Sequence, residues 1–131
     1  MYATVLGRDP ESTYRQIDIA GRTAEADGPA LVQLLYEELI RALGAAAWAA
    51  ENRQFRIKSE KVTRATAILF ALEAGLDFEA GGTVATALAQ LYGSARRTVV
   101  DASIGHDPAP FREIAASLTE IAQAWREARA A

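Results

Sequence analysis

The stretch LFALEAGLDFEAGGTVATALAQLY, residues 69–92, decides the fold expected for this chain. On both sides of its centre, apolar residues recur every three or four positions, the spacing that places side chains on one face of a helix. The first set is Val62, Ala65, Leu69, Leu72 and Leu76, and the second is Val84, Leu88, Leu91, Ala95 and Val99. The join between the sets, residues 75–82, is short, so the two helices are predicted to be antiparallel neighbours.

Three glycines in this join predict where the chain turns. Gly75 directly follows the first apolar set and is predicted to end that helix with a positive φ, because glycine has no Cβ to penalise this conformation. Gly81 and Gly82 are predicted to let the chain turn sharply into the next helix, which is expected to span about 82–102.

The rest of the chain predicts two further helices and an N-terminal arm. One helix is expected to begin at Asp27-Gly28-Pro29, where proline suits the first turn, and to end near Asn52. The last is expected to begin at Asp107-Pro108 and to bury a stripe from Phe111 to Trp125. Together with a helix over about 55–74, the short joins predict an all-α, antiparallel four-helix bundle over residues 28–131. Residues 1–27 are expected to form a mobile arm or a short helix.

The composition limits the class of protein. The 131 residues are 50% hydrophobic, which suits one domain with a core, and the net charge of −3 argues against nucleic-acid binding. The absence of cysteine excludes thiol catalysis and fits a reducing cytosol. The first ten residues lack the apolar segment of a signal peptide, and the longest apolar run, residues 43–50, is far below the roughly 20 residues of a membrane-spanning helix. We therefore expect a cytoplasmic protein without membrane insertion.

No pattern typical of a catalytic, metal or cofactor site is found. His106 is the one histidine, and it is predicted to lie in a loop, whereas histidine phosphotransfer needs an exposed histidine in mid-helix and a di-iron bundle needs two Glu-x-x-His pairs. Glu37 and Glu38 are adjacent and therefore face different directions on a helix, which indicates surface charge. The sequence predicts no enzymatic activity, no catalytic residue, no metal ligand and no cofactor.

An ordered set of residues along the chain matches the pattern of one protein family. Its members here are Met1-Tyr2, Tyr14, Gln16, Pro29, Leu72 to Asp77, Glu79, Gly81-Gly82, Leu88, Leu91-Tyr92, Asp107, Leu118 and Ala124-Trp125. In this order and at these intervals they resemble the FliS family of flagellar secretion chaperones, and the resemblance covers nearly the whole chain. Two positions depart from the family pattern: Asp27-Gly28 replaces a serine before the proline, and Ser94 replaces a frequent second tyrosine.

The resemblance implies a cytosolic export chaperone. Members of this family bind the disordered C-terminal segment of flagellin in apolar grooves, prevent its premature polymerisation and deliver it to the flagellar type III export apparatus, whose gate is a second expected partner. A disordered client loses chain entropy when it binds, so a long apolar track suits it. Tyr14 stands where the family has an N-terminal tyrosine that contacts or shields the binding surface. The arm around Tyr14 and Ile17 is therefore either such a shield or a frayed tail.

Apolar residues in excess of one buried stripe per helix support a binding role. A helix with a second row of apolar residues beside its buried row, not covered by a neighbouring helix, predicts a groove for an amphipathic partner helix. The residues expected to contact the partner are Tyr14, Ile17, Ile68, Leu72, Ala85, Ala89 and Tyr92. Two interpretations of the last five stay open, because the second stripe forms either an open groove or the far side of the core. The chaperone is expected to be a monomer or a weak dimer. The alternative functions are a phosphorelay or enzymatic bundle and a self-associating interaction module.

Overall fold

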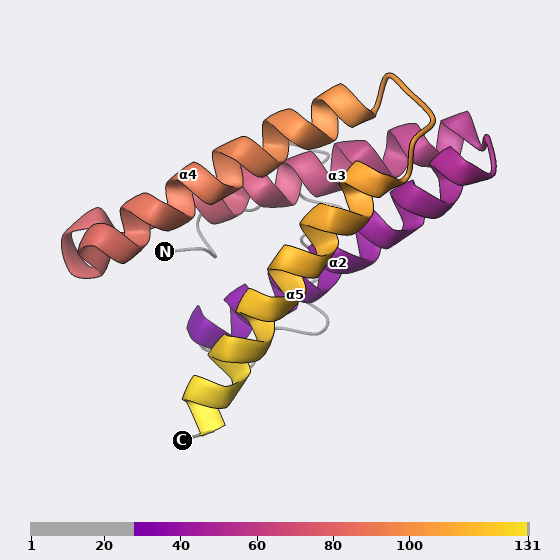
Figure 1. Cartoon of the computed structure of the whole chain (residues 1–131). Coiled ribbons are helices and arrows are strands. Elements are labelled where there is room, and N and C mark those ends of the chain that lie inside the picture. The colour runs from indigo at the N-terminus through magenta and orange to yellow at the C-terminus, as the bar shows by residue number, and fades with distance from the viewer. Residues whose placement is uncertain (1–27, 131) are drawn as a thin grey trace.

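The computed structural model describes residues 28–130, apart from the side chain of residue 129, and this part of the chain is helical with no strand. The helices are α2 (Gly28–Glu51), α3 (Phe55–Ala74), α4 (Phe78–Ala102) and α5 (Ala109–Ala130) (Figure 1). The predicted all-α antiparallel bundle is confirmed. The predicted arm, residues 1–27, lies outside the described residues. None of the helices described is long and apolar enough to cross a membrane.

Helix α2 is the centre of the bundle. It packs against α3 on one side and α5 on another, while α4 packs mainly against α3 and only lightly against α5. This arrangement explains why α2 carries two apolar stripes, since each neighbouring helix covers one of them. Buried residues therefore occur on a wide arc of α2, including Leu35, Tyr36, Leu39, Leu43 and Ala46.

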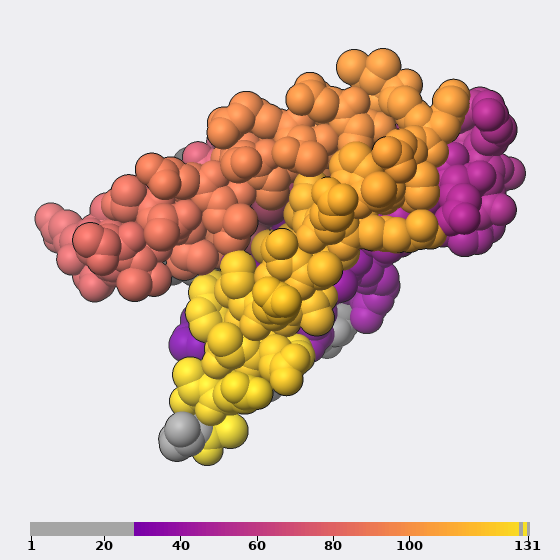
Figure 2. All heavy atoms as spheres, in the orientation of Figure 1, coloured from indigo at the N-terminus to yellow at the C-terminus, as the bar shows by residue number. Residues whose placement is uncertain are grey.

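Helices α4 and α5 diverge from the loop that joins them. Figure 1 shows the N-terminal half of α4 and the C-terminal half of α5 pointing in different directions. Figure 2 shows a wedge-shaped opening between these two halves on the molecular surface. The molecule is thus a bundle that is closed at the end carrying the α2–α3 and α4–α5 connections and open at the other.

Aromatic side chains fill the centre of the bundle. The Tyr36 ring lies 4.8 Å from the Trp125 ring of α5 and 6.2 Å from the Tyr92 ring of α4, measured between centroids. The hydroxyl oxygens of Tyr36 and Tyr92 are 2.6 Å apart and share a hydrogen bond. Because a buried tyrosine needs a partner for its hydroxyl, this pairing lets both aromatic residues be completely buried.

The closed end is tied together by a lysine. Lys58, near the start of α3, is only 6% exposed, and its Nζ donates a hydrogen bond to the carbonyl oxygen of Gly105 at 2.7 Å. The same ammonium lies 5.5 Å from the centre of the Phe55 ring, and that ring lies 5.1 Å from the His106 ring. Lys58 thereby connects the α4–α5 loop to α3, which holds the two connections of this end together.

The α3–α4 turn differs from the sequence prediction in two respects. Gly75 does end α3, but its φ is −86°, so the predicted positive φ is wrong. Helix α4 begins at Phe78 instead of about residue 82, because the Asp77 carboxylate caps it by accepting hydrogen bonds from the amides of Glu79 and Ala80 at 3.1 and 3.0 Å. Leu76 and Asp77 therefore reverse the chain, and the positive φ falls at Gly82 (φ 53°, ψ −127°), inside a kinked α4.

Candidate functional site

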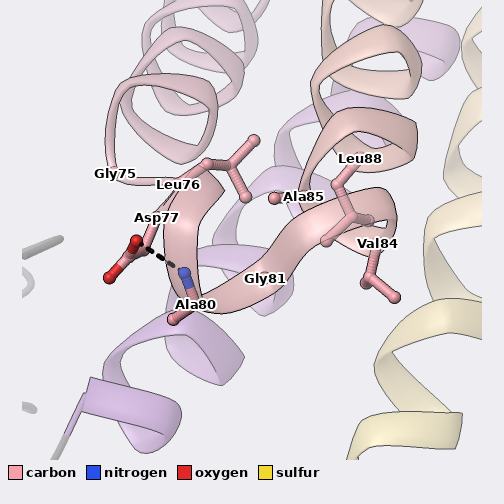
Figure 3. A pocket seen from close by; sticks show the side chains of 8 residues that line it. All are labelled: Gly75, Leu76, Asp77, Ala80, Gly81, Val84, Ala85 and Leu88. Atoms are coloured by element: carbon pink, nitrogen blue, oxygen red, sulfur yellow. Dashed lines mark hydrogen bonds between the residues drawn. The ribbon is translucent and has the colours of Figure 1, made fainter.

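A pocket opens beside the kink of α4, and we call it the kink pocket. Its volume is about 300 Å³, and it is lined by Gly75, Leu76, Asp77, Ala80, Gly81, Val84, Ala85 and Leu88. Figure 3 shows Leu76 on one side and Leu88 on the other, with Ala85 between them. The dashed line to Ala80 in the same view shows Asp77 engaged as the helix cap. Apart from Asp77, the lining side chains are apolar, so the pocket is suited to apolar ligands.

Two glycines give the pocket its shape. The φ and ψ of Gly82 lie outside the regions that residues with a Cβ adopt, so glycine permits the kink. At Gly81, a Cβ would lie 2.8 Å from the Cβ of Ala85, closer than carbon atoms approach without displacement. The absence of both side chains lets the first turn of α4 fold closely against the second. The kink pocket is then enclosed by the α3–α4 turn, the kink of α4 and the end of α3.

Exposed apolar side chains lie next to the kink pocket. Phe78 at the start of α4 is 54% exposed and Val84, on the pocket wall, is 64% exposed. Elsewhere among the described residues, the large exposed apolar side chains are Trp48, Phe55, Phe70, Val100 and Ile104. Exposed apolar area next to a concave site is typical of a surface that binds a partner.

The structure separates the residues that the sequence proposed for partner binding. Ile68, Leu72 and Tyr92 lie in the hydrophobic core cluster, which fits the interpretation that the second stripe is the far side of the core. Ala85 is 2% exposed and lines the kink pocket, whereas Ala89 is half-buried.

Tyr14 and Ile17 lie outside the described residues. Partner contact by all seven residues stays a prediction.

The predicted core stripe of α4 is displaced by one residue at two places. Val84 and Leu91 were expected in the core, but Ala85 and Tyr92 are buried instead, and Val84 faces outward. Leu88, Ala95 and Val99 pack in the core or against it, as expected, so the buried face differs from the predicted one at these two positions. The pairing of Tyr92 with Tyr36 fixes which face of α4 is buried. The sequence favoured Leu91 for the core because leucine is ordinarily more often buried than tyrosine.

Charged side chains of the described residues form ion pairs both between helices and within a helix. Glu38 of α2 accepts hydrogen bonds from Arg64 of α3 at 2.9 Å and from Arg41 at 2.7 Å, and Glu73 of α3 accepts one from Arg96 of α4 at 2.8 Å. Across residues 28–130, no group of three or more histidine, aspartate or glutamate side chains is placed to hold a metal ion.

Comparison with known proteins identifies the family of the chain. The family model described as "Flagellar protein FliS" matches residues 10–131. A flagellar secretion chaperone FliS of Salmonella typhimurium is 30% identical over 115 residues, which cover 87% of this chain and 85% of the relative. The flagellar secretion chaperone FliSB of Pseudomonas aeruginosa is 30% identical over 112 residues, covering 86% of this chain and 89% of the relative. A match over nearly the whole length, on a bundle of the expected class, shows that the chain belongs to the FliS family of flagellar proteins.

Proposed function

We propose that the protein is a cytoplasmic export chaperone for flagellin. It binds the disordered C-terminal segment of flagellin, prevents premature polymerisation and delivers the client to the flagellar type III export apparatus. The observation that carries this proposal is the family match over residues 10–131, together with relatives that are named flagellar secretion chaperones. Such a protein acts by binding and release, so its function requires client surface and no catalytic group.

The described surface offers places for such a client. Figure 2 shows an opening between α4 and α5, and the exposed apolar side chains of Phe78 and Val84 lie near the start of α4. A segment that folds on binding can follow such a discontinuous apolar track, because it orders piece by piece as it docks. Of the predicted partner-binding residues that the structure describes, Ala85 lines the kink pocket and Ala89 lies one helical turn further along α4.

The proposal is tested by measuring the mass of the protein in solution. Size-exclusion chromatography with light scattering is run on the full chain alone and with a peptide spanning the C-terminal segment of flagellin. We expect a 1:1 complex, with added helical circular dichroism as the peptide orders. A scrambled peptide is the control. A mass that rises with protein concentration but not with added peptide would support the self-associating module and contradict the chaperone.

A single substitution locates the client surface on α4. Ala89→Glu places a carboxylate at a half-buried position where it can still reach water, so the protein should stay folded and bind the flagellin peptide at least about tenfold more weakly. The matched control is Ala46→Glu, whose site is completely buried, and this variant should unfold. A folded Ala89→Glu variant with unchanged affinity would remove this part of α4 from the client surface.

A further inference from the structure

We propose that the kink pocket holds one large apolar side chain of the client, and that a lysine or arginine of the client lies within one helical turn of that side chain. This inference rests on the proposed function and adds to it the chemistry of an anchor point. It follows from the size of the pocket, its apolar walls and the charge of its surroundings.

The size of the pocket fits a single large side chain. A dry cavity of about 150 Å³ in a protein core holds a benzene molecule. The kink pocket, at about 300 Å³ and open on one side, accommodates a phenylalanine, methionine or leucine side chain together with part of its backbone. A whole helix does not fit in this volume. The pocket is therefore an anchor site at one end of a longer track.

The walls of the pocket favour an apolar occupant. Leu76 and Leu88 are half-buried, and Val84 is 64% exposed, so a side chain inserted between them would remove apolar surface of both partners from water. The Oδ1 atom of Asp77 is already the acceptor for two backbone amides. Asp77 is the one polar side chain among the lining residues, so the walls offer a polar occupant few hydrogen-bonding partners.

The charge around the pocket favours a cationic neighbour. Residues 65–95 contain three acidic residues, Glu73, Asp77 and Glu79, and no lysine or arginine. Glu73 is paired with Arg96, whereas Asp77 and Glu79 are exposed and form no ion pair within the described part of the chain. Asp77 lines the pocket, and Glu79 follows two residues later in the first turn of α4. An apolar client side chain followed by a lysine or arginine would match the pocket and this acidic rim together.

The first test changes the pocket wall and measures affinity. Val84→Glu puts a charge at the pocket, and binding of a fluorescent flagellin C-terminal peptide, followed by anisotropy, should weaken at least about tenfold. Val100→Glu is the matched control, because it changes an exposed valine (49%) near the other end of the same helix, and it should alter the affinity by less than about twofold. Both sites are exposed, so circular dichroism and the melting temperature should stay close to wild type.

The second test removes the acidic rim without removing the helix cap. Asparagine caps helices about as well as aspartate, so the double variant Asp77→Asn/Glu79→Gln keeps α4 intact. It should weaken peptide binding several-fold at low ionic strength, and the difference should vanish near 1 M salt, where the Debye length falls to about 3 Å. Equal affinities of wild type and variant for the peptide at low salt would contradict the inference that a client lysine or arginine lies beside the pocket.

The third test identifies the occupant directly. The chain has no cysteine, so Val84→Cys introduces a single thiol that, with an added thiol oxidant to accept the two electrons, can form a disulfide with cysteines placed one at a time along the flagellin segment. Trapping should be concentrated at one large apolar position with a lysine or arginine within four residues. Trapping spread evenly over the segment, or between two copies of the chaperone, would overturn the inference.

The outcomes separate the two proposals. If wild type binds the flagellin peptide but Val84→Glu binds it equally well, the anchor site is wrong and the chaperone function stands. If wild type does not bind the peptide, the proposed function fails and the anchor site fails with it.

Discussion

At the scale of single residues, Gly82 fixes the geometry of the kink in α4. Its φ of 53° and ψ of −127° are unfavourable for any residue with a Cβ. Gly82→Ala should lower the free energy of unfolding by about 1–3 kcal/mol, because the kink must then be held against backbone strain. Urea denaturation followed by circular dichroism measures the change.

A second glycine provides the control for this prediction. Gly44 lies in the middle of α2, is exposed, and has nothing within 4 Å of an added Cβ. Gly44→Ala should therefore raise the free energy of unfolding by about 0.5–1 kcal/mol, since alanine favours helix. Stabilisation by both substitutions would show that Gly82 does not carry the strain assigned to it.

At the scale of elements, a tyrosine pair joins two helices that are not neighbours. The backbones of α2 and α4 do not approach each other, yet the hydroxyls of Tyr36 and Tyr92 meet at 2.6 Å. Tyr36→Phe and Tyr92→Phe should each lower the free energy of unfolding by about 1 kcal/mol. The double variant should lose less than the sum, because the two changes remove the same hydrogen bond.

The measurement for this pair is a double-mutant cycle. Urea denaturation of wild type, both single variants and the double variant gives the coupling energy, expected at about 0.5 kcal/mol or more. The rings remain in all four proteins, so the packing of Tyr36 against Trp125 and against Tyr92 is held constant. Additive losses would mean that the hydroxyls stabilise the bundle independently and do not couple α2 to α4.

At the scale of the whole molecule, the N-terminal arm is predicted to shield apolar surface. Deletion of residues 1–24 should raise the fluorescence of an apolar dye added to the free protein, while the helical circular dichroism of the bundle stays. The reason is that Tyr14 stands where the resemblance implies a tyrosine that contacts or shields the binding surface, and Ile17 is the apolar residue three positions after it. The full-length variant Tyr14→Ser/Ile17→Ser should raise dye binding in the same way, which controls for chain length. Unchanged dye fluorescence in both proteins would identify the arm as a passive tail.

The helices were predictable because their signals are local. The start of α2 follows from Gly28-Pro29, the end of α3 from Gly75 and the start of α5 from Asp107-Pro108, each within a residue or two of the observed bound. The start of α4 was predicted four residues late. The pair Gly81-Gly82 predicts a turn at that point, but the Asp77 carboxylate caps the helix four residues earlier and the glycines form a kink inside it.

The candidate site was less predictable, because it depends on the rotation of helices about their own axes. The spacing of apolar residues places Val84 or Ala85 in the core almost equally well, and no local feature of the sequence decides between them. The choice is made by Tyr92 on the same helix, whose hydroxyl pairs with Tyr36 of α2, 56 positions away in the chain. This contact turns Val84 outward and brings Ala85 to the back of the kink pocket.

The sequence by itself determined the helical class, the approximate helix bounds and the family. Apolar spacing, helix caps and the order of motifs can all be identified from the sequence without knowing contacts between distant residues. Only the tertiary structure decided that α2 is central, that α4 and α5 diverge, and that a pocket opens at the α3–α4 turn. The physical reason is that these features are set by contacts between distant residues. Each helix must satisfy its buried apolar and hydroxyl groups against all of its neighbours at once.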